Sequence, residues 1–213
     1  MTTPRSRAVW FASAAVLAVG GALAAGATSA AFTDEARLVT TGRIGSPFTF
    51  DIGVVDQGGM VRQADGPAGI DWPIAGADTL VPGHSITTEL TVFNNTRQVG
   101  ADTTVSIVLR NDDGAVADKP NITGYLRFTA RIDGVAVFED RAWADAEGSI
   151  GVLAARGTAP LADGAAYTAG NAGSERNLEL TITYLDADGV EYLNGGQAAI
   201  ALSFDAEATA TAP

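Results

Sequence analysis

Few residues in this chain could carry chemistry. There is one histidine, His84, and no cysteine. Zinc proteolysis needs three protein ligands and a general base, usually two histidines one helical turn apart with a glutamate between them. A Ser-His-Asp triad would need the same histidine, which follows Pro82-Gly83 in a turn sequence and is accompanied by no Gly-x-Ser-x-Gly elbow. We therefore expect no catalytic residues, no cofactor, no catalytic metal and no enzymatic activity.

Paired carboxylates are common, as in Asp112-Asp113 and Glu139-Asp140, and in an acidic β-protein they usually form turns or solvated rims. The run Asp-Ala-Asp-Gly-Val-Glu over residues 186–191 resembles the start of a calcium loop. It lacks the fifth-position ligand and the distant glutamate of an EF-hand. We interpret Asp188-Gly189 as a hairpin turn, and cation binding by acidic loops stays open.

The start of the chain has the layout of an export signal. Two arginines precede an uncharged run over residues 8–26, and Thr28 and Ala30 are small residues suited to positions −3 and −1 of a cleavage site. We predict that a signal peptidase cuts between Ala30 and Ala31, so that the chain is secreted or lies at the cell surface. The alternative is a retained membrane anchor, because nineteen apolar residues could just span a bilayer. The run is rich in Ala and Gly and ends in small residues, which favours cleavage and confines membrane contact to the uncleaved precursor.

The composition is strongly acidic, with a formal net charge of −12 at pH 7. Such a chain repels nucleic acid and anionic lipid, so we exclude both as partners. The charges are spread along the sequence, which is typical of a solvated surface. Two sequons, Asn94-Asn95-Thr96 and Asn121-Ile122-Thr123, fit the N-glycosylation pattern. We interpret them as unused in a chain with a bacterial type of signal.

The elements that position these residues are predicted to be strands. Apolar and polar residues alternate over residues 86–92, which places Ile86, Leu90 and Val92 on one face of a half-buried antiparallel strand. The same alternation predicts strands at 105–109, 126–132, 178–184 and 200–204, with weaker ones at 48–55, 135–138 and 150–153. Short helical turns are expected within 140–148 or 161–170.

Turn signals separate these strands at residues 111–114, at Asp133-Gly134 and at Asp188-Gly189. About seven to nine strands with unequal connections predict one all-β domain, an antiparallel β-sandwich of the jelly-roll-like kind. We divide the chain into a signal peptide at 1–30, a separate N-terminal segment at 31–41 and the sandwich at 42–213.

Several of these motifs resemble one family. Residues 30–36 read Ala-Ala-Phe-Thr-Asp-Glu-Ala directly after the signal, and residues 41–45 (Thr-Gly-Arg-Ile-Gly) follow as a strand opening. Residues 80–85 (Leu-Val-Pro-Gly-His-Ser) precede 90–95 (Leu-Thr-Val-Phe-Asn-Asn), and the chain closes on residues 198–208. Together these resemble the camelysin and TasA-type proteins of biofilm-matrix fibres, which are matured by a SipW-type signal peptidase. Camelysin carries a metallopeptidase label, which the single histidine of this chain does not support.

The resemblance implies polymerisation by strand donation, in which the newly cut N-terminal segment inserts into the sandwich of the next subunit. The candidate donor strand here is residues 31–41, with Ala31 at its start and Phe32, Ala36 and Leu38 on one face of an extended strand. Asp34 falls on the same face. The alternative is that this strand folds back on its own sandwich.

Two functions therefore stand as hypotheses. The first is a secreted structural protein of the cell surface or extracellular (biofilm) matrix that self-associates into fibres, with the signal peptidase as its partner during export. The second is a monomeric secreted module that binds a surface ligand through the rim loops of the sandwich.

Overall fold

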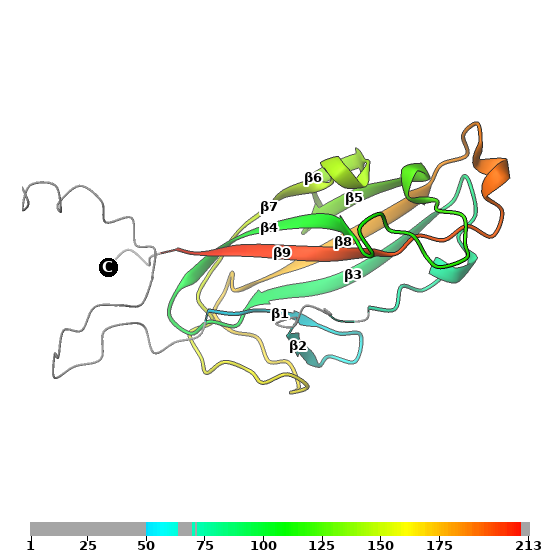
Figure 1. The fold of residues 1–213 in the computed structure, drawn as a ribbon. Coiled ribbons are helices and arrows are strands. Elements are labelled where there is room, and N and C mark those ends of the chain that lie inside the picture. The colour runs from blue at the N-terminus through cyan, green and yellow to red at the C-terminus, as the bar shows by residue number, and fades with distance from the viewer. Residues whose placement is uncertain (1–49, 64–69, 71, 210–213) are drawn as a thin grey trace, which may run out of the picture. The chain divides into compact units, whose positions relative to one another are not determined.

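The described part of the chain contains nine β-strands and four single-turn 3-10 helices (Figure 1). The computed structural model describes residues 50–63, 70 and 72–209. The predicted signal peptide, the cleavage site at Ala30 and Ala31, and the donor-strand residues Phe32, Ala36 and Leu38 lie outside the described residues. The strands are β1 (Ile52–Val55), β2 (Val61–Gln63), β3 (Ser85–Asn94), β4 (Gly100–Leu109), β5 (Leu126–Ile132), β6 (Val135–Arg141), β7 (Glu147–Leu153), β8 (Glu175–Tyr184) and β9 (Ile200–Thr209). The helices are η1 (Ala77–Thr79), η2 (Thr123–Tyr125), η3 (Trp143–Asp145) and η4 (Val190–Leu193).

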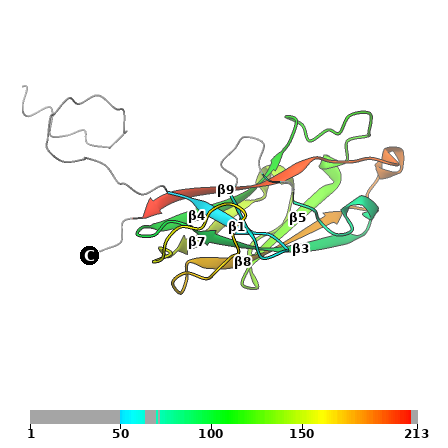
Figure 2. The same ribbon diagram turned by 90° about the horizontal axis from the view of Figure 1, so that it is seen from below.

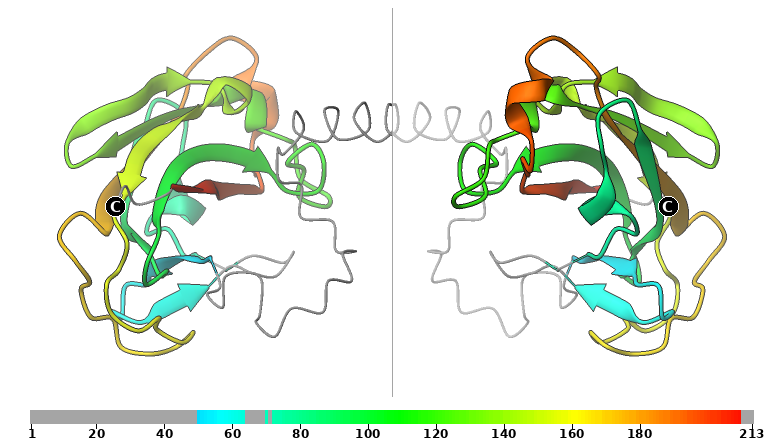
Figure 3. Two further views of the ribbon diagram at one scale, coloured as in Figure 1. Left: turned by 90° about the vertical axis from the view of Figure 1, so that its left-hand side faces the viewer. Right: turned by 90° about the vertical axis from the view of Figure 1, so that its right-hand side faces the viewer.

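These strands form two antiparallel sheets, which confirms the predicted all-β sandwich. One sheet has six strands in the order β2-β1-β3-β8-β5-β6, and the other has three in the order β7-β4-β9. The chain changes sheet between β3 and β4, between β4 and β5, and at every connection from β6 to β9. Figure 3 views the two layers along their strands, from either end. The six-stranded sheet is twice as wide as the sheet that faces it.

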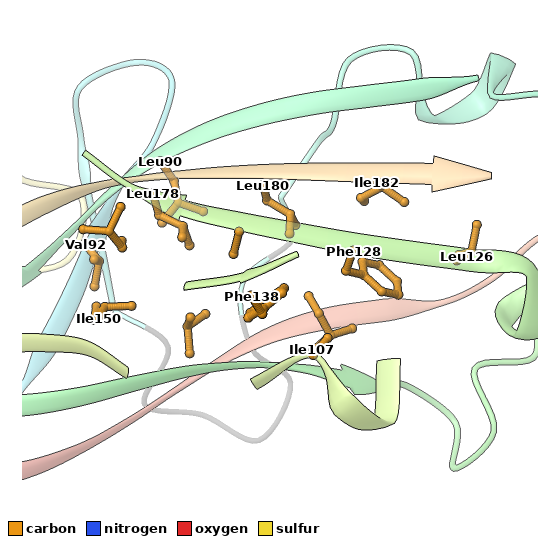
Figure 4. Packing of buried hydrophobic residues seen from close by; sticks show 14 of the residues in the cluster. Leu90, Val92, Ile107, Leu126, Phe128, Phe138, Ile150, Leu178, Leu180 and Ile182 are labelled. Carbon is orange, nitrogen blue, oxygen red and sulfur yellow. The ribbon is translucent and has the colours of Figure 1, made fainter. Parts of the chain in front are cut away.

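Alternation along each strand explains the two layers. In β5 the residues Leu126, Phe128, Ala130 and Ile132 are all buried, and the residues between them are half-buried. β8 repeats this pattern beside it, with Leu178 paired to Ile132 and Ile182 paired to Phe128. Side chains at every second position therefore point into one core. Figure 4 shows the labelled members of that core from both sheets packed between the strands: Leu90, Val92, Ile107, Leu126, Phe128, Phe138, Ile150, Leu178, Leu180 and Ile182.

The outer face of the six-stranded sheet is polar. The Ser85 and Thr183 hydroxyl oxygens lie 2.8 Å apart, and those of Thr87 and Thr181 lie 3.0 Å apart. Beyond them Glu89 is directly opposite Glu179 across the β3–β8 pair. Cross-strand hydroxyl pairs stabilise a sheet, whereas like charges directly opposite each other destabilise it.

One of the three turn signals makes a hairpin. Asp133 and Gly134 join β5 to β6 with φ angles of 49° and 83°, and the flanking Ile132 and Val135 are paired. Positive φ at both central positions is the signature of a type I′ hairpin. The hairpin prediction at Asp188-Gly189 is wrong, because that turn leads into η4 on a long connection from β8 to β9 in the other sheet. Residues 111–114 likewise begin a crossing between sheets.

Other local predictions had mixed outcomes. The helical turn expected within 140–148 is present as η3, whereas residues 161–170 contain no helix. Strand β2 was not predicted, because three residues are too short to show a period. Among the described residues, no helix has the length and apolarity needed to cross a membrane.

Candidate functional site

The residues that could have carried chemistry do not converge. His84 is exposed in its turn, with Nδ1 3.2 Å from the carbonyl oxygen of Pro82. Asp112 and Asp113 lie in the turn after β4, and Glu139 and Asp140 are exposed on β6. No group of three or more His, Cys, Asp or Glu side chains within the described ranges is arranged to hold a metal ion.

The acidic run at 186–191 serves a turn. The Glu191 carboxylate accepts a hydrogen bond from the Gly189 backbone N–H at 2.9 Å, and the Tyr125 hydroxyl donates to the Asp188 carbonyl at 3.2 Å. Gly189 has a φ of 93°, which a residue with a side chain rarely adopts. These contacts place η4 at the rim of the sandwich.

One end of the sandwich is closed by buried polar side chains, and we call it the closed end. The Asn94 side chain is fully buried, and its Nδ2 donates to the carbonyls of Val99 at 2.8 Å and Ala154 at 3.1 Å. Its Oδ1 accepts the backbone N–H of Thr96 at 2.8 Å. Asn95 is also fully buried and donates to the Asp51 carboxylate at 2.7 Å. The first sequon is thus inaccessible to a glycosylating enzyme, and its side chains hold the chain between β3 and β4.

Arg156 completes the closed end on the outer side of β3. Arg156 is 1% exposed, and its guanidinium lies 5.6 Å from the ring centre of Phe93 and 5.8 Å from that of Tyr167. It donates to the Ala159 carbonyl at 3.2 Å and also to Thr168. The Tyr167 hydroxyl donates to the Glu175 carboxylate. Burial raises the pKa of Tyr167 far above its usual value, and the hydrogen bond to Glu175 is the second largest cause.

The three-stranded sheet ends in a long edge strand. Among the described strands β9 pairs only with β4, and all ten of its residues take part, from Ile200 opposite Leu109 to Thr209 opposite Gly100. Figure 2 shows β9 from below, running the length of the sandwich. On its other side β9 pairs with no other described strand. An edge of this length is a template for another extended segment.

The inner face of β9 is incompletely covered. Leu202, Phe204 and Ala206 point to the core but are only half-buried, in contrast to the fully buried Val105 on β4 beside them. The inner residues Ile52 and Val54 of β1 in the opposite sheet are also half-buried. The narrower sheet thus leaves apolar surface beside β9 partly exposed.

A groove of about 870 Å³ opens at the end of the sandwich where β9 starts, and we call this the open end. The right-hand panel of Figure 3 looks onto this end, with η4 and η1 at its rim. Apolar residues from both sheets and from the loops line the groove, and they include Trp72, Ile74, Leu80, Ile86, Ile122, Leu126, Ile182, Tyr184, Val190, Leu193 and Ile200. Burial is the main cause that raises the pKa of Tyr184, and the neighbouring Tyr125 is the second cause. A groove of this size and lining suits an apolar ligand or an extended peptide.

The rim of the groove is acidic. Asp78 of η1, Asp186 after β8 and Glu191 of η4 line it, together with one guanidinium, Arg110. All four side chains are exposed. The rim therefore carries more negative than positive charge and favours a basic occupant.

The sequence matches no protein-family model and no curated protein. Sequence reasoning predicted the start of β9 but gave no sign that β9 is an edge, because strand order depends on contacts far apart in the chain. The groove was missed for the same reason. In each strand the apolar residues that line the groove look like the ordinary alternation of a buried face. A half-buried apolar residue at the start of a strand, next to an exposed loop, is the feature that could have indicated the groove.

Proposed function

We propose that this protein is a secreted structural protein of the cell surface or extracellular (biofilm) matrix, whose subunits join when the N-terminal segment of one pairs with the free edge of β9 in the next. The observation that carries the proposal is this edge, ten residues long with a half-buried apolar inner face. Membership of the camelysin and TasA-type family is part of the proposal and rests on the resembling motifs. No catalytic step is included.

The candidate donor strand matches the edge in length and face. Residues 31–41 span about 36 Å when extended, close to the about 33 Å of β9. Phe32, Ala36 and Leu38 share one face with Asp34, and the apolar side chains of that face can cover the half-buried Leu202 and Phe204. Burying one large apolar side chain contributes about 1.5–3 kcal/mol. The added backbone ladder would also remove the open edge.

The ends of the strands favour donation between subunits. Ile52 is paired with Asn94, and the Asn94 side chain donates to the carbonyl of Val99. Gly100, which follows Val99, is paired with Thr209 at the end of β9. The chain thus enters the described sandwich at the closed end, where β9 finishes. A strand that folded back directly from there would run parallel to β9, whereas all pairs among the described strands β1–β9 are antiparallel.

An antiparallel pairing within one subunit leaves the connection little slack. Residue 41 would have to lie at the start of β9, about 30 Å from the closed end. The ten steps from residue 41 to Asp51, which is hydrogen-bonded at the closed end, span at most about 33–36 Å, so the connection would have to be almost fully extended. A neighbour stacked head to tail delivers its segment from the open end, and the strand then runs antiparallel to β9 without strain. Cleavage before Ala31 would release the segment, so processing would control assembly.

The proposal is tested with matched variants of the secreted chain. Its mass should place the N-terminus at Ala31. This protein should form filaments visible by electron microscopy. Leu38→Asp, on the inner face of the donor strand, should abolish them, and Val39→Asp, on the opposite face, should not. Wild-type protein that stays monomeric at high concentration at acidic and neutral pH, or equal effects of the two variants, would contradict strand donation.

A second candidate is a monomeric surface-binding module, and the groove at the open end favours it. In that case the rim loops around Trp72 and Leu193 would contact a ligand, and removing residues 31–41 would leave binding unchanged. The solution mass of the mature protein separates the two candidates, because only the structural protein polymerises.

A further inference from the structure

The groove at the open end lies beside the start of β9, where a donor strand from a second copy would end. We propose that residues 42–49 of the donating subunit bind in this groove of the accepting subunit, forming a second contact beyond the donor strand. The inference rests on the proposed strand donation and adds a different site, with its own residues and charge. It assigns the groove to a second copy of this chain instead of a foreign ligand.

The position of the groove supports this occupant. Ala198, Ala199 and Ile200 line it and lead directly into β9. When a donor strand runs antiparallel to β9, residue 41 lies at Ile200. The next residues must therefore cross the groove before they reach their own sandwich. The eight residues 42–49 can span up to about 26–29 Å, which is enough to cross the open end.

The polarity of residues 42–49 also fits. Ile44 has the same parity as Phe32, Ala36 and Leu38, so in a continuous extended strand its side chain lies on the face that points inward. There it meets an apolar floor that includes Ile86, Ile182 and Ile200. Ile86 and Ile200 are half-buried in the absence of an occupant.

Charge complementarity gives the contact its orientation. In the same extended strand Arg43, the neighbour of Ile44, would point the opposite way, towards the rim. The rim carries Asp78, Asp186 and Glu191 against Arg110, and residues 42–49 contain no acid. An arginine at an acidic rim strengthens association and sets its register.

A charge-swap cycle on the full mature chain tests the contact. Arg43→Glu and Asp186→Arg should each raise the critical concentration for filament formation about tenfold, which corresponds to about 1.4 kcal/mol. The double variant should return to within about twofold of wild type, because the swapped pair attracts again. Glu147→Arg, an equally exposed carboxylate on β7 outside the groove, is the matched control and should change little. Thermal unfolding of each variant checks that the sandwich is intact.

The outcomes separate the two proposals. If Leu38→Asp abolishes filaments but the effects of Arg43→Glu and Asp186→Arg simply add, strand donation holds and the groove contact is overturned. If Leu38→Asp and Val39→Asp behave alike, strand donation itself fails. Rescue in the double variant supports the groove contact directly, since Arg43 and Asp186 then act on each other.

Discussion

The two ends of the sandwich differ in the side chains that cover them. The closed end is filled by buried polar groups, with Asn94 and Asn95 fully buried and hydrogen-bonded and Arg156 packed beside the rings of Phe93 and Tyr167. The open end has aliphatic side chains around a groove, and Ile86 there is half-buried. Strand β3 runs from one end to the other, so a single strand passes from an open apolar site to a closed polar one.

This difference indicates that the closed end contributes more to the stability of the fold, whereas the open end leaves apolar surface for binding. Buried polar groups that are hydrogen-bonded, such as the side chains of Asn94 and Asn95, specify one arrangement and are costly to disturb. Half-buried apolar groups contribute less to folding but gain from being covered later. The closed end is therefore suited to holding the fold, and the open end is suited to association.

The largest effect is expected at the closed end. Asn94→Ala removes an amide that satisfies the carbonyls of Val99 and Ala154 and the backbone N–H of Thr96. Leaving such groups buried without partners should lower the free energy of unfolding by about 3 kcal/mol. Urea unfolding at low protein concentration measures it. Asn177→Ala, exposed on the adjacent strand β8, is the control. Similar losses of unfolding free energy in Asn94→Ala and Asn177→Ala would contradict the special role of the buried amide at the closed end.

A smaller effect is expected at the open end. Ile86→Ala should cost about 1–2 kcal/mol, less than the roughly 2–5 kcal/mol of a fully buried large-to-small change, because its side chain is only partly covered. Leu90→Ala, on the same face of β3 and buried, is the comparison in the same denaturation experiment. If Ile86 costs as much as Leu90, the open end is as well packed as the core.

The pH dependence of the closed end comes next. The pKa of Tyr167 is raised in the folded state, first by burial and then by its hydrogen bond to Glu175. The resulting stability is fully present below the unfolded-state pKa of about 10 and is lost as the pH rises above it. Tyr167→Phe should cost about 1 kcal/mol at neutral pH, and its difference from wild type should shrink above about pH 10. A difference in unfolding free energy between wild type and Tyr167→Phe that stays constant above about pH 10 would exclude a contribution of Tyr167 ionisation to stability.

The smallest effect is expected on the outer face of the six-stranded sheet. Glu89 faces Glu179, which has Arg131 on its other side. Glu89→Lys should therefore stabilise the fold by about 0.5 kcal/mol, an effect that salt reduces. Glu147→Lys, opposite Ser106 on β4, should show no such gain. Equal thermal shifts of the two variants would mean that overall charge, not the pair, is responsible.

Sequence alone determined most of the strands and their faces. The alternation over residues 86–92 and 126–132 is a local property, since neighbouring side chains on a strand must point to opposite faces. β5 runs over Leu126–Ile132, the residues that alternation predicted, and the Asp133-Gly134 hairpin follows from the positive φ that these two residues tolerate. The all-β sandwich follows from the number of such strands.

Only the tertiary structure decided which strand lies at an edge and how each end is finished. In the sequence Asn94 is recognisable only as part of a sequon, whereas in the fold it is buried and bonded to Val99 and Ala154. Asp188-Gly189 looks like a hairpin, yet β8 and β9 belong to different sheets. The groove is lined by residues between Trp72 and Ile200. Local propensity cannot specify such features, because they arise from contacts between segments far apart in the sequence, and those contacts exist only once the two sheets have packed.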